Sequence, residues 1–197
     1  MLFRSQPAAL TGVDGLRAIL AQLDGVELPA RAWERDVLPA RLQGYEPAML
    51  DMLCLTGEVA WARLSTGPTP VVGATPIALF LREHSAAWLS LRDRMGDLGA
   101  GFSRPGAAVL DHVRTRGASF AHEISAACNI TDQEFRDAIG ELVAAGLVTS
   151  DGFAGLRTLV GASSPITAGR WSELRGAADQ QARAAGVEAL ARVLLQR

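Results

Sequence analysis

Gly117-Ala-Ser-Phe-Ala-His-Glu-Ile124, Leu142-Val-Ala-Ala-Gly-Leu-Val-Thr-Ser-Asp151 and Gly152-Phe-Ala-Gly-Leu-Arg-Thr-Leu159 decide the fold. The first stretch is a short β-type run followed by a helical pattern. The second ends a further helix at a glycine and begins a strand, and the third crosses a turn and returns. Short strand, helix, capped helix and β-wing is the order of a winged helix, a helix-turn-helix variant that usually serves nucleic acid.

The rest of this second unit agrees with that order. Pro105 occupies the start of a helix, where its missing N–H costs little. Thr131-Asp-Gln-Glu134 is a capping box ahead of the helix that Gly146 ends. We expect Leu156 to Val160 to be the strand that returns from the wing, and the unit to span residues 104–161.

An earlier unit repeats the arrangement. Apolar residues recur at helical spacing over residues 13–23, a short helix broken by Pro39 spans 31–42, and Glu46-Pro47 opens a third helix. Residues 58–64 and 75–82 have strand character, and the Gly/Pro loop 66–73 between them is the expected wing tip. A connecting helix should follow over residues 85–95.

The predicted fold class is therefore α+β, mainly helical, with tandem winged-helix domains. We expect a first unit with its connecting helix over residues 1–96, a glycine-rich linker over 97–103 and the second unit over 104–161. Residues 162–197 should hold a linker and the start of a truncated further unit, in which Gly169-Arg-Trp-Ser172 is either a strand or a packed loop. Val187, Leu190, Val193 and Leu194 predict a last helix.

The composition excludes several function classes. The net charge of −2 is unlike the basic excess of a free-standing DNA-binding domain. All 19 basic residues are arginine, so no phosphate-loop, Schiff-base or general-base lysine exists. Cys54 and Cys128 are far apart and are expected to be free thiols of a reducing cytoplasm. No apolar run has membrane-spanning length, so we expect a cytoplasmic protein with no membrane partner.

One short segment could grip a DNA strand. It carries a cluster of arginines with an aromatic residue: Arg31, Trp33, Arg35 and Arg41. Arginine holds phosphates and an aromatic ring stacks on a base. In the alternative interpretation, Trp33 packs in the core while Glu34 and Asp36 neutralise the arginines.

Arg63 and Arg82 flank the expected first wing and either touch a DNA backbone or pair across strands. The third helices argue against base readout. Residues 46–56 hold no basic residue, and residues 131–145 hold four acids against Arg136 alone. DNA contact is therefore expected through the wings and the second helix, or else these units are spacers and protein contacts.

No catalytic constellation is visible. The histidines are single, with no HExxH pattern and no metal-ligand spacing, so neither a metal nor another cofactor is expected in this chain. No nucleophile is paired with a base.

Six motifs in order carry a family resemblance: Ala32-Trp-Glu-Arg-Asp-Val-Leu-Pro-Ala-Arg41, Leu55-Thr-Gly-Glu-Val-Ala-Trp61, Thr75-Pro-Ile-Ala-Leu-Phe-Leu-Arg-Glu83, Gly117-Ala-Ser-Phe120, Leu147-Val-Thr-Ser-Asp-Gly-Phe-Ala-Gly-Leu-Arg157 and Gly169-Arg-Trp-Ser172. Together they resemble the region behind the motor in the large helicase-related (Lhr) family of bacterial superfamily-2 helicases. The resemblance runs from about Thr11 to the C-terminus.

The resemblance implies an ATP-dependent motor that moves 3′ to 5′ on single-stranded DNA and acts in DNA repair. The chain itself has neither a GxxxxGK[ST] loop nor a DExH box, so ATP and magnesium would belong to motor domains elsewhere in the parent protein. The implied role is a non-catalytic DNA-binding accessory fragment, with a single strand or a duplex junction and the motor domains as partners. The alternative is a protein-interaction or architectural winged-helix module.

Overall fold

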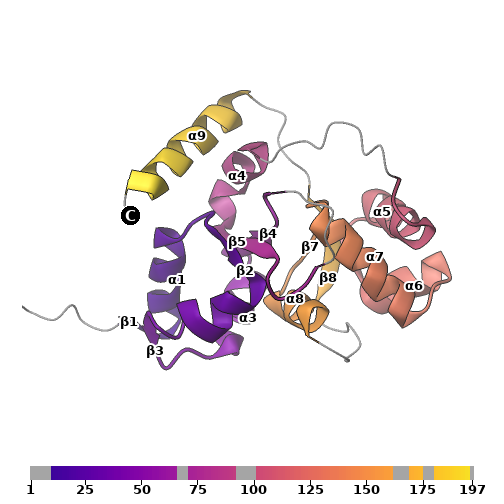
Figure 1. Ribbon diagram of the computed structural model, residues 1–197, viewed down its shortest axis with the longest axis horizontal. Helices are drawn as coiled ribbons and strands as arrows, with labels where there is room; N and C mark the ends of the chain where they lie inside the picture. Colours follow the sequence, from indigo (N-terminus) through magenta and orange to yellow (C-terminus); the bar gives the residue numbers. More distant parts are fainter. Residues whose placement is uncertain (1–9, 66–70, 92–100, 162–168, 175–179, 196–197) are drawn as a thin grey trace, which may run out of the picture.

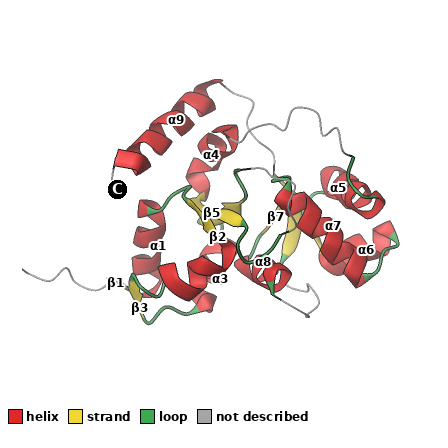
Figure 2. Ribbon diagram, viewed as in Figure 1, coloured by secondary structure: helices red, strands yellow, loops and turns green. Residues whose placement is uncertain are grey.

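The computed structural model describes residues 10–65, 71–91, 101–161, 169–174 and 180–195 (Figure 1). Helices surround two small antiparallel sheets, which lie in separate parts of the molecule (Figure 2). Each sheet belongs to one stretch of the chain, and the two stretches form a first and a second group of elements.

The first group follows the order expected from the sequence, with three short strands added, one ahead of each of its three helices. Its three-stranded sheet has the order β2-β5-β4, and a short parallel pair joins β1 to β3. The elements are β1 (Leu10–Thr11), α1 (Gly12–Gln22), β2 (Glu27–Pro29), α2 (Ala30–Ala32), the π-helical turn η1 (Trp33–Val37), β3 (Leu42–Gln43), α3 (Pro47–Leu55), β4 (Val59–Ala62) and β5 (Pro76–Leu81).

Local chemistry explains these boundaries. The buried side of α1 consists of apolar residues at helical spacing, and Pro47 occupies the first turn of α3. Gly25 follows α1 with φ of +72°, and a Cβ there would run into the Trp88 ring. The second helix, expected to continue to residue 42, ends at Val37 ahead of Pro39. Residues 66–70 of the expected wing tip lie outside the described part of the chain.

The second group has a sheet of order β6-β8-β7, again antiparallel. Its capping box is present, since Thr131 Oγ1 accepts from the Glu134 N–H at 3.2 Å and Glu134 Oε2 accepts from the Thr131 N–H at 2.8 Å. The elements are α5 (Arg104–Arg116), β6 (Ser119–Phe120), α6 (Ala121–Cys128), α7 (Asp132–Ala144), β7 (Val148–Ser150), α8 (Phe153–Val160) and β8 (Arg170–Glu173).

One expected strand is a helix. Residues 156–160, predicted to return from the wing, belong to α8, whose Phe153, Leu156 and Leu159 are buried at helical spacing. The strand that returns is β8, the Gly169-Arg-Trp-Ser172 segment. The second group therefore extends to Glu173, past the boundary at 161 expected from the sequence.

The two groups share a continuous apolar core instead of forming two separate ones. Trp61 of β4 meets Phe153 of α8 and Trp171 of β8 edge to face, with ring centroids 6.5 and 6.1 Å apart. Its Nε1 donates to the Gly152 carbonyl at 3.2 Å, and its own carbonyl accepts from Thr149 Oγ1 at 2.7 Å.

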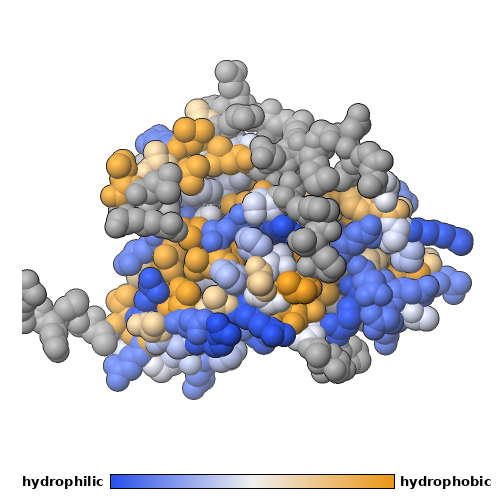
Figure 3. Space-filling model, in the orientation of Figure 1, coloured by the Kyte–Doolittle hydropathy of each residue, from blue (hydrophilic) through white to orange (hydrophobic). Residues whose placement is uncertain are grey.

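Two further helices lie side by side at the edge of the first group (Figure 1). The 3-10 turn η2 (Arg82–His84) leads into α4 (Ser85–Leu91), the expected connecting helix, and α9 (Gln180–Leu195) packs against it. Gly186 makes this close approach possible, because a Cβ there would lie 2.5 Å from the Ala87 carbonyl oxygen. Val187 and Leu190 are largely exposed, and the surface over α9 is apolar in Figure 3. No helix in the described ranges is long and apolar enough to cross a bilayer.

Candidate nucleic-acid interface

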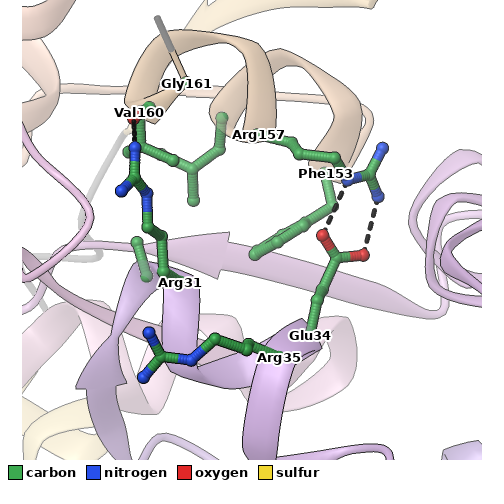
Figure 4. A pocket seen from close by; sticks show the side chains of 9 residues that line it. Arg31, Glu34, Arg35, Phe153, Arg157, Val160 and Gly161 are labelled. Atoms are coloured by element: carbon green, nitrogen blue, oxygen red, sulfur yellow. Dashed lines mark hydrogen bonds and ion pairs between the residues drawn. The ribbon is translucent and has the colours of Figure 1, made fainter.

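An ion-pair network joins the two groups where α8 meets α2 and η1 (Figure 4). The Arg157 guanidinium donates to both oxygens of Glu34, at 2.7 and 2.8 Å, and to Asp51 of α3 at 3.1 Å. The hydrogen bonds to Glu34 raise the pKa of Arg157 further above its ordinary value. Tyr45 also donates to Glu34 at 2.8 Å, and burial together with that carboxylate raises the Tyr45 pKa.

This network includes Asp51 of α3, the third helix of the first group. Asp51 accepts from the Ala154 N–H in the first turn of α8 at 2.9 Å, in addition to Arg157. In a winged helix, the third helix is the one that enters the major groove. Here α8 lies against the Asp51 side of α3, whereas Ala48, Met52 and Leu55 of the same helix are exposed.

The third helix of the second group is unsuited to DNA for a different reason. The exposed side of α7 carries Asp132, Glu134 and Asp137, and its surface is hydrophilic in Figure 3. Its one arginine, Arg136, donates to the Thr158 carbonyl at the end of α8 at 2.9 Å. An acidic helix whose cation is already bound to protein is repelled by phosphates.

Three of the predicted contact residues are exposed. Arg31 donates from Nη2 to the Val160 carbonyl at 2.7 Å and has no carboxylate partner within the part of the chain that the structure describes. Arg35 pairs with its neighbour Asp36 at 2.8 Å, a contact that raises the pKa of Arg35 and lowers that of Asp36. Arg41 reaches only the Val37 carbonyl, at 3.3 Å.

Trp33 confirms the alternative interpretation, in which it packs in the core, and Arg63 corrects the prediction. Trp33 is 0% exposed and donates from Nε1 to the Ile77 carbonyl at 2.8 Å, so its ring is a core element and is inaccessible to a base. Arg63 is 6% exposed and donates to the Ser65 carbonyl at 2.6 Å, so it neither faces solvent nor pairs across strands.

The remaining candidate, Arg82, lies apart from the others. It is exposed and borders a hollow of about 620 Å³ between the two groups. Arg170 borders the same hollow but is paired with Asp151 at 2.8 Å. The structure thus brings Arg31 and Arg35 together and leaves Arg82 elsewhere.

Arg31 and Arg35 border a hollow of about 400 Å³ between the second helix and α8. This site was not predicted from the sequence, because residues 156–160 were expected to form a strand. The helical spacing of Phe153, Leu156 and Leu159 was the signal that could have found it. In the described ranges, no group of three or more His, Cys, Asp or Glu side chains could hold a metal ion.

Comparison with known proteins agrees with the first group's architecture. Residues 3–82 match the family model described as the winged-helix domain of the large helicase-related protein. The chain is 36% identical over 178 residues to the Lhr helicase/uracil glycosylase of Escherichia coli K12, which covers 83% of this chain and 11% of that protein. It is 32% identical over 152 residues to the Lhr helicase/probable uracil glycosylase of Mycolicibacterium smegmatis, covering 76% of this chain and 10% of that protein.

The chain thus spans about a tenth of the curated relatives that it matches. Their similarity extends over most of its residues, and the family model covers the first group of elements. The chain belongs to the large helicase-related family and carries that family's winged-helix domain.

Proposed function

We propose that this chain is a non-catalytic DNA-binding accessory part of an ATP-dependent 3′-to-5′ helicase that acts in DNA repair. Its partners would be single-stranded DNA or a duplex junction and the motor domains of the same parent protein, where ATP and magnesium would bind. Membership of the family and the relatives named as helicases support this proposal.

In this proposal the second group is a second winged helix. In both sheets the strand that precedes the second helix pairs with the last strand, and the last strand pairs with the one after the third helix. The second wing differs in carrying α8 between β7 and β8, and that helix holds the two groups together. A tandem arrangement of this kind would present one continuous surface to a DNA strand.

The observation that carries DNA binding is the exposure of Arg31, Arg35 and Arg41 on and just after the second helix. A guanidinium presents several donors in a flat fork that matches phosphate oxygens. Arg31 and Arg41 have only carbonyl partners, so phosphates can replace or join these contacts without breaking an ion pair. Backbone contact from this segment requires neither α3 nor α7 to read bases.

The test is binding of a fluorescently labelled 20-nucleotide single strand, measured by anisotropy at about 50 and 200 mM salt, because phosphate contacts release counterions. Affinity should fall with added salt, and the double substitution Arg31→Ala with Arg41→Ala should weaken binding and flatten its salt dependence. Arg17→Ala with Arg116→Ala is the matched control, since both side chains are exposed but lie on α1 and α5. Equal weakening by the two double variants would count against this site.

The second candidate is a protein-interaction or architectural module. Two observations favour this candidate: the contact between α8 and α3, and the acidic surface of α7. It predicts no salt-dependent binding of any single strand or junction, while the folded chain would bind the separately prepared motor domains of the parent helicase.

A further inference from the structure

The hollow between the second helix and α8 combines cations with an apolar floor. Arg31 and Arg35 lie one turn apart on the same helical segment, and their side chains border one side of the hollow (Figure 4). Its volume is about 400 Å³. Its apolar lining consists of Ala30, Phe153 and Leu156, which are buried, and Val160, which is partly exposed.

The charges around this hollow leave Arg31 and Arg35 open to an anion. Arg35 and Asp36 are exposed by 73% and 51%, and such a surface pair is weak and exchanges readily. The acid that also lines the hollow, Glu34, has both oxygens bound to Arg157. Arg31 is held in place by the Val160 carbonyl and keeps most of its donors.

A ligand that suits cations beside an apolar surface combines an anionic group with an apolar part. A nucleotide does so, because its phosphate is charged and its base has two flat apolar faces. Proteins that hold single strands combine cations along the backbone with surfaces on which bases stack. Arginine planes also stack on bases. A paired base in a duplex could not enter, because its faces are covered by its neighbours in the stack.

We propose that this hollow receives one unstacked nucleotide of a single DNA strand, with its phosphate on Arg31 and Arg35 and its base against Val160. The inference rests on the proposed DNA-binding function and adds a preference for single strands. Residues 30–35 belong to the first group and residues 153–161 to the second, so the site exists only while the two groups are docked.

The first experiment compares two ligands on the unmodified chain. A 20-nucleotide thymidine strand and an abasic strand of the same length carry the same phosphates but differ in their bases. We expect the abasic strand to bind about 4-fold more weakly, the effect of burying apolar surface equivalent to about one methylene group of Val160. Equal, salt-dependent affinity for both would overturn the nucleotide site and leave the proposed function standing. No binding of either strand would overturn both.

The second experiment fills the hollow. Val160→Trp adds a large side chain to the floor but keeps both arginines and the carbonyl that holds Arg31. It should abolish the difference between the two strands, whereas Val160→Ala should retain it. Retention of the full difference in Val160→Trp would overturn the assignment. Circular dichroism checks folding, and if Val160→Trp does not fold, the comparison of strands on the unmodified chain decides by itself.

Discussion

Replacing Arg157 by methionine tests whether the ion-pair network holds the two groups together. Methionine keeps much of the side-chain volume but removes every donor. Glu34 and Asp51 would each lose their cation while remaining 16% and 23% exposed. The variant therefore leaves two poorly solvated carboxylates near each other, on the surface where α8 meets α2 and α3.

The burial of these groups sets the expected magnitude. Removing one partner of a fully buried pair costs about 3–5 kcal/mol, whereas an exposed pair contributes about 0–1 kcal/mol. Arg157 is 35% exposed, which lies between these limits, and we expect a loss of about 2 kcal/mol. For a chain of this size, about 1 kcal/mol corresponds to about 2–4 °C in Tm, so the Tm should fall by about 4–8 °C.

Thermal unfolding followed by circular dichroism measures this shift. Arg114→Met is the matched control, because Arg114 forms its 2.8 Å pair with Glu173 inside the second group and is 50% exposed. Adding Glu34→Gln to Arg157→Met should restore part of the loss, since it removes one of the unpaired carboxylates. If Arg157→Met and Arg114→Met unfold within about 2 °C of each other, the network does not hold the groups together.

Four further predictions concern packing and thiol chemistry. Trp61→Ala should lower stability by about 3–5 kcal/mol in urea unfolding, and a loss near that of a surface substitution would contradict the shared core. Gly186→Ala should detach α9 from α4 and speed proteolysis within residues 180–195; unchanged protection would show that the close approach to Ala87 does not matter. Burial raises the pKa of the Cys54 thiol to about 12, so at pH 8 a thiol reagent should modify Cys128 much faster than Cys54 in the folded chain and both equally after unfolding. Because the raised folded pKa means that the folded state holds this proton more tightly, the Cys54 contribution to stability should decrease as pH rises above its ordinary pKa of 9.0; stability that is flat from pH 9 to 11 would contradict it.

The elements that were predicted correctly carry their signals within a few residues. The Thr131 capping box and Pro47 mark helix starts through hydrogen bonds and backbone angles that involve only near neighbours. The third helices were also assessed correctly as acidic, because charge is read from the residues themselves. Such local signals predicted the helices of both groups as far as α7, whereas the strands β1, β2 and β3 were missed because each has only two or three residues.

The candidate site depended on contacts that no short window contains. Trp33 and Arg63 have polar atoms typical of a DNA contact, but both are buried, Trp33 with its Nε1 bound to the Ile77 carbonyl of β5 and Arg63 with its Nε bound to the Ser65 carbonyl. Arg35 kept the exposed position that its sequence context predicted. The alternative in which Glu34 and Asp36 neutralise the arginines of this segment is confirmed for Asp36, which pairs with Arg35. It is wrong for Glu34, which pairs with Arg157 of α8.

Composition and periodicity were enough to establish a mainly helical chain without lysine, without motor motifs and with third helices unsuited to base readout. Tertiary packing, and not composition or periodicity, decides how the two groups join. It also decides the contact between α8 and α3 and the hollow beside Arg31. Arg157 and Glu34 are 123 residues apart in sequence, and their pairing follows from the position in which α8 docks. Hydrogen bonds and helical spacing act over a few residues, whereas docking depends on the summed burial of many side chains from both groups.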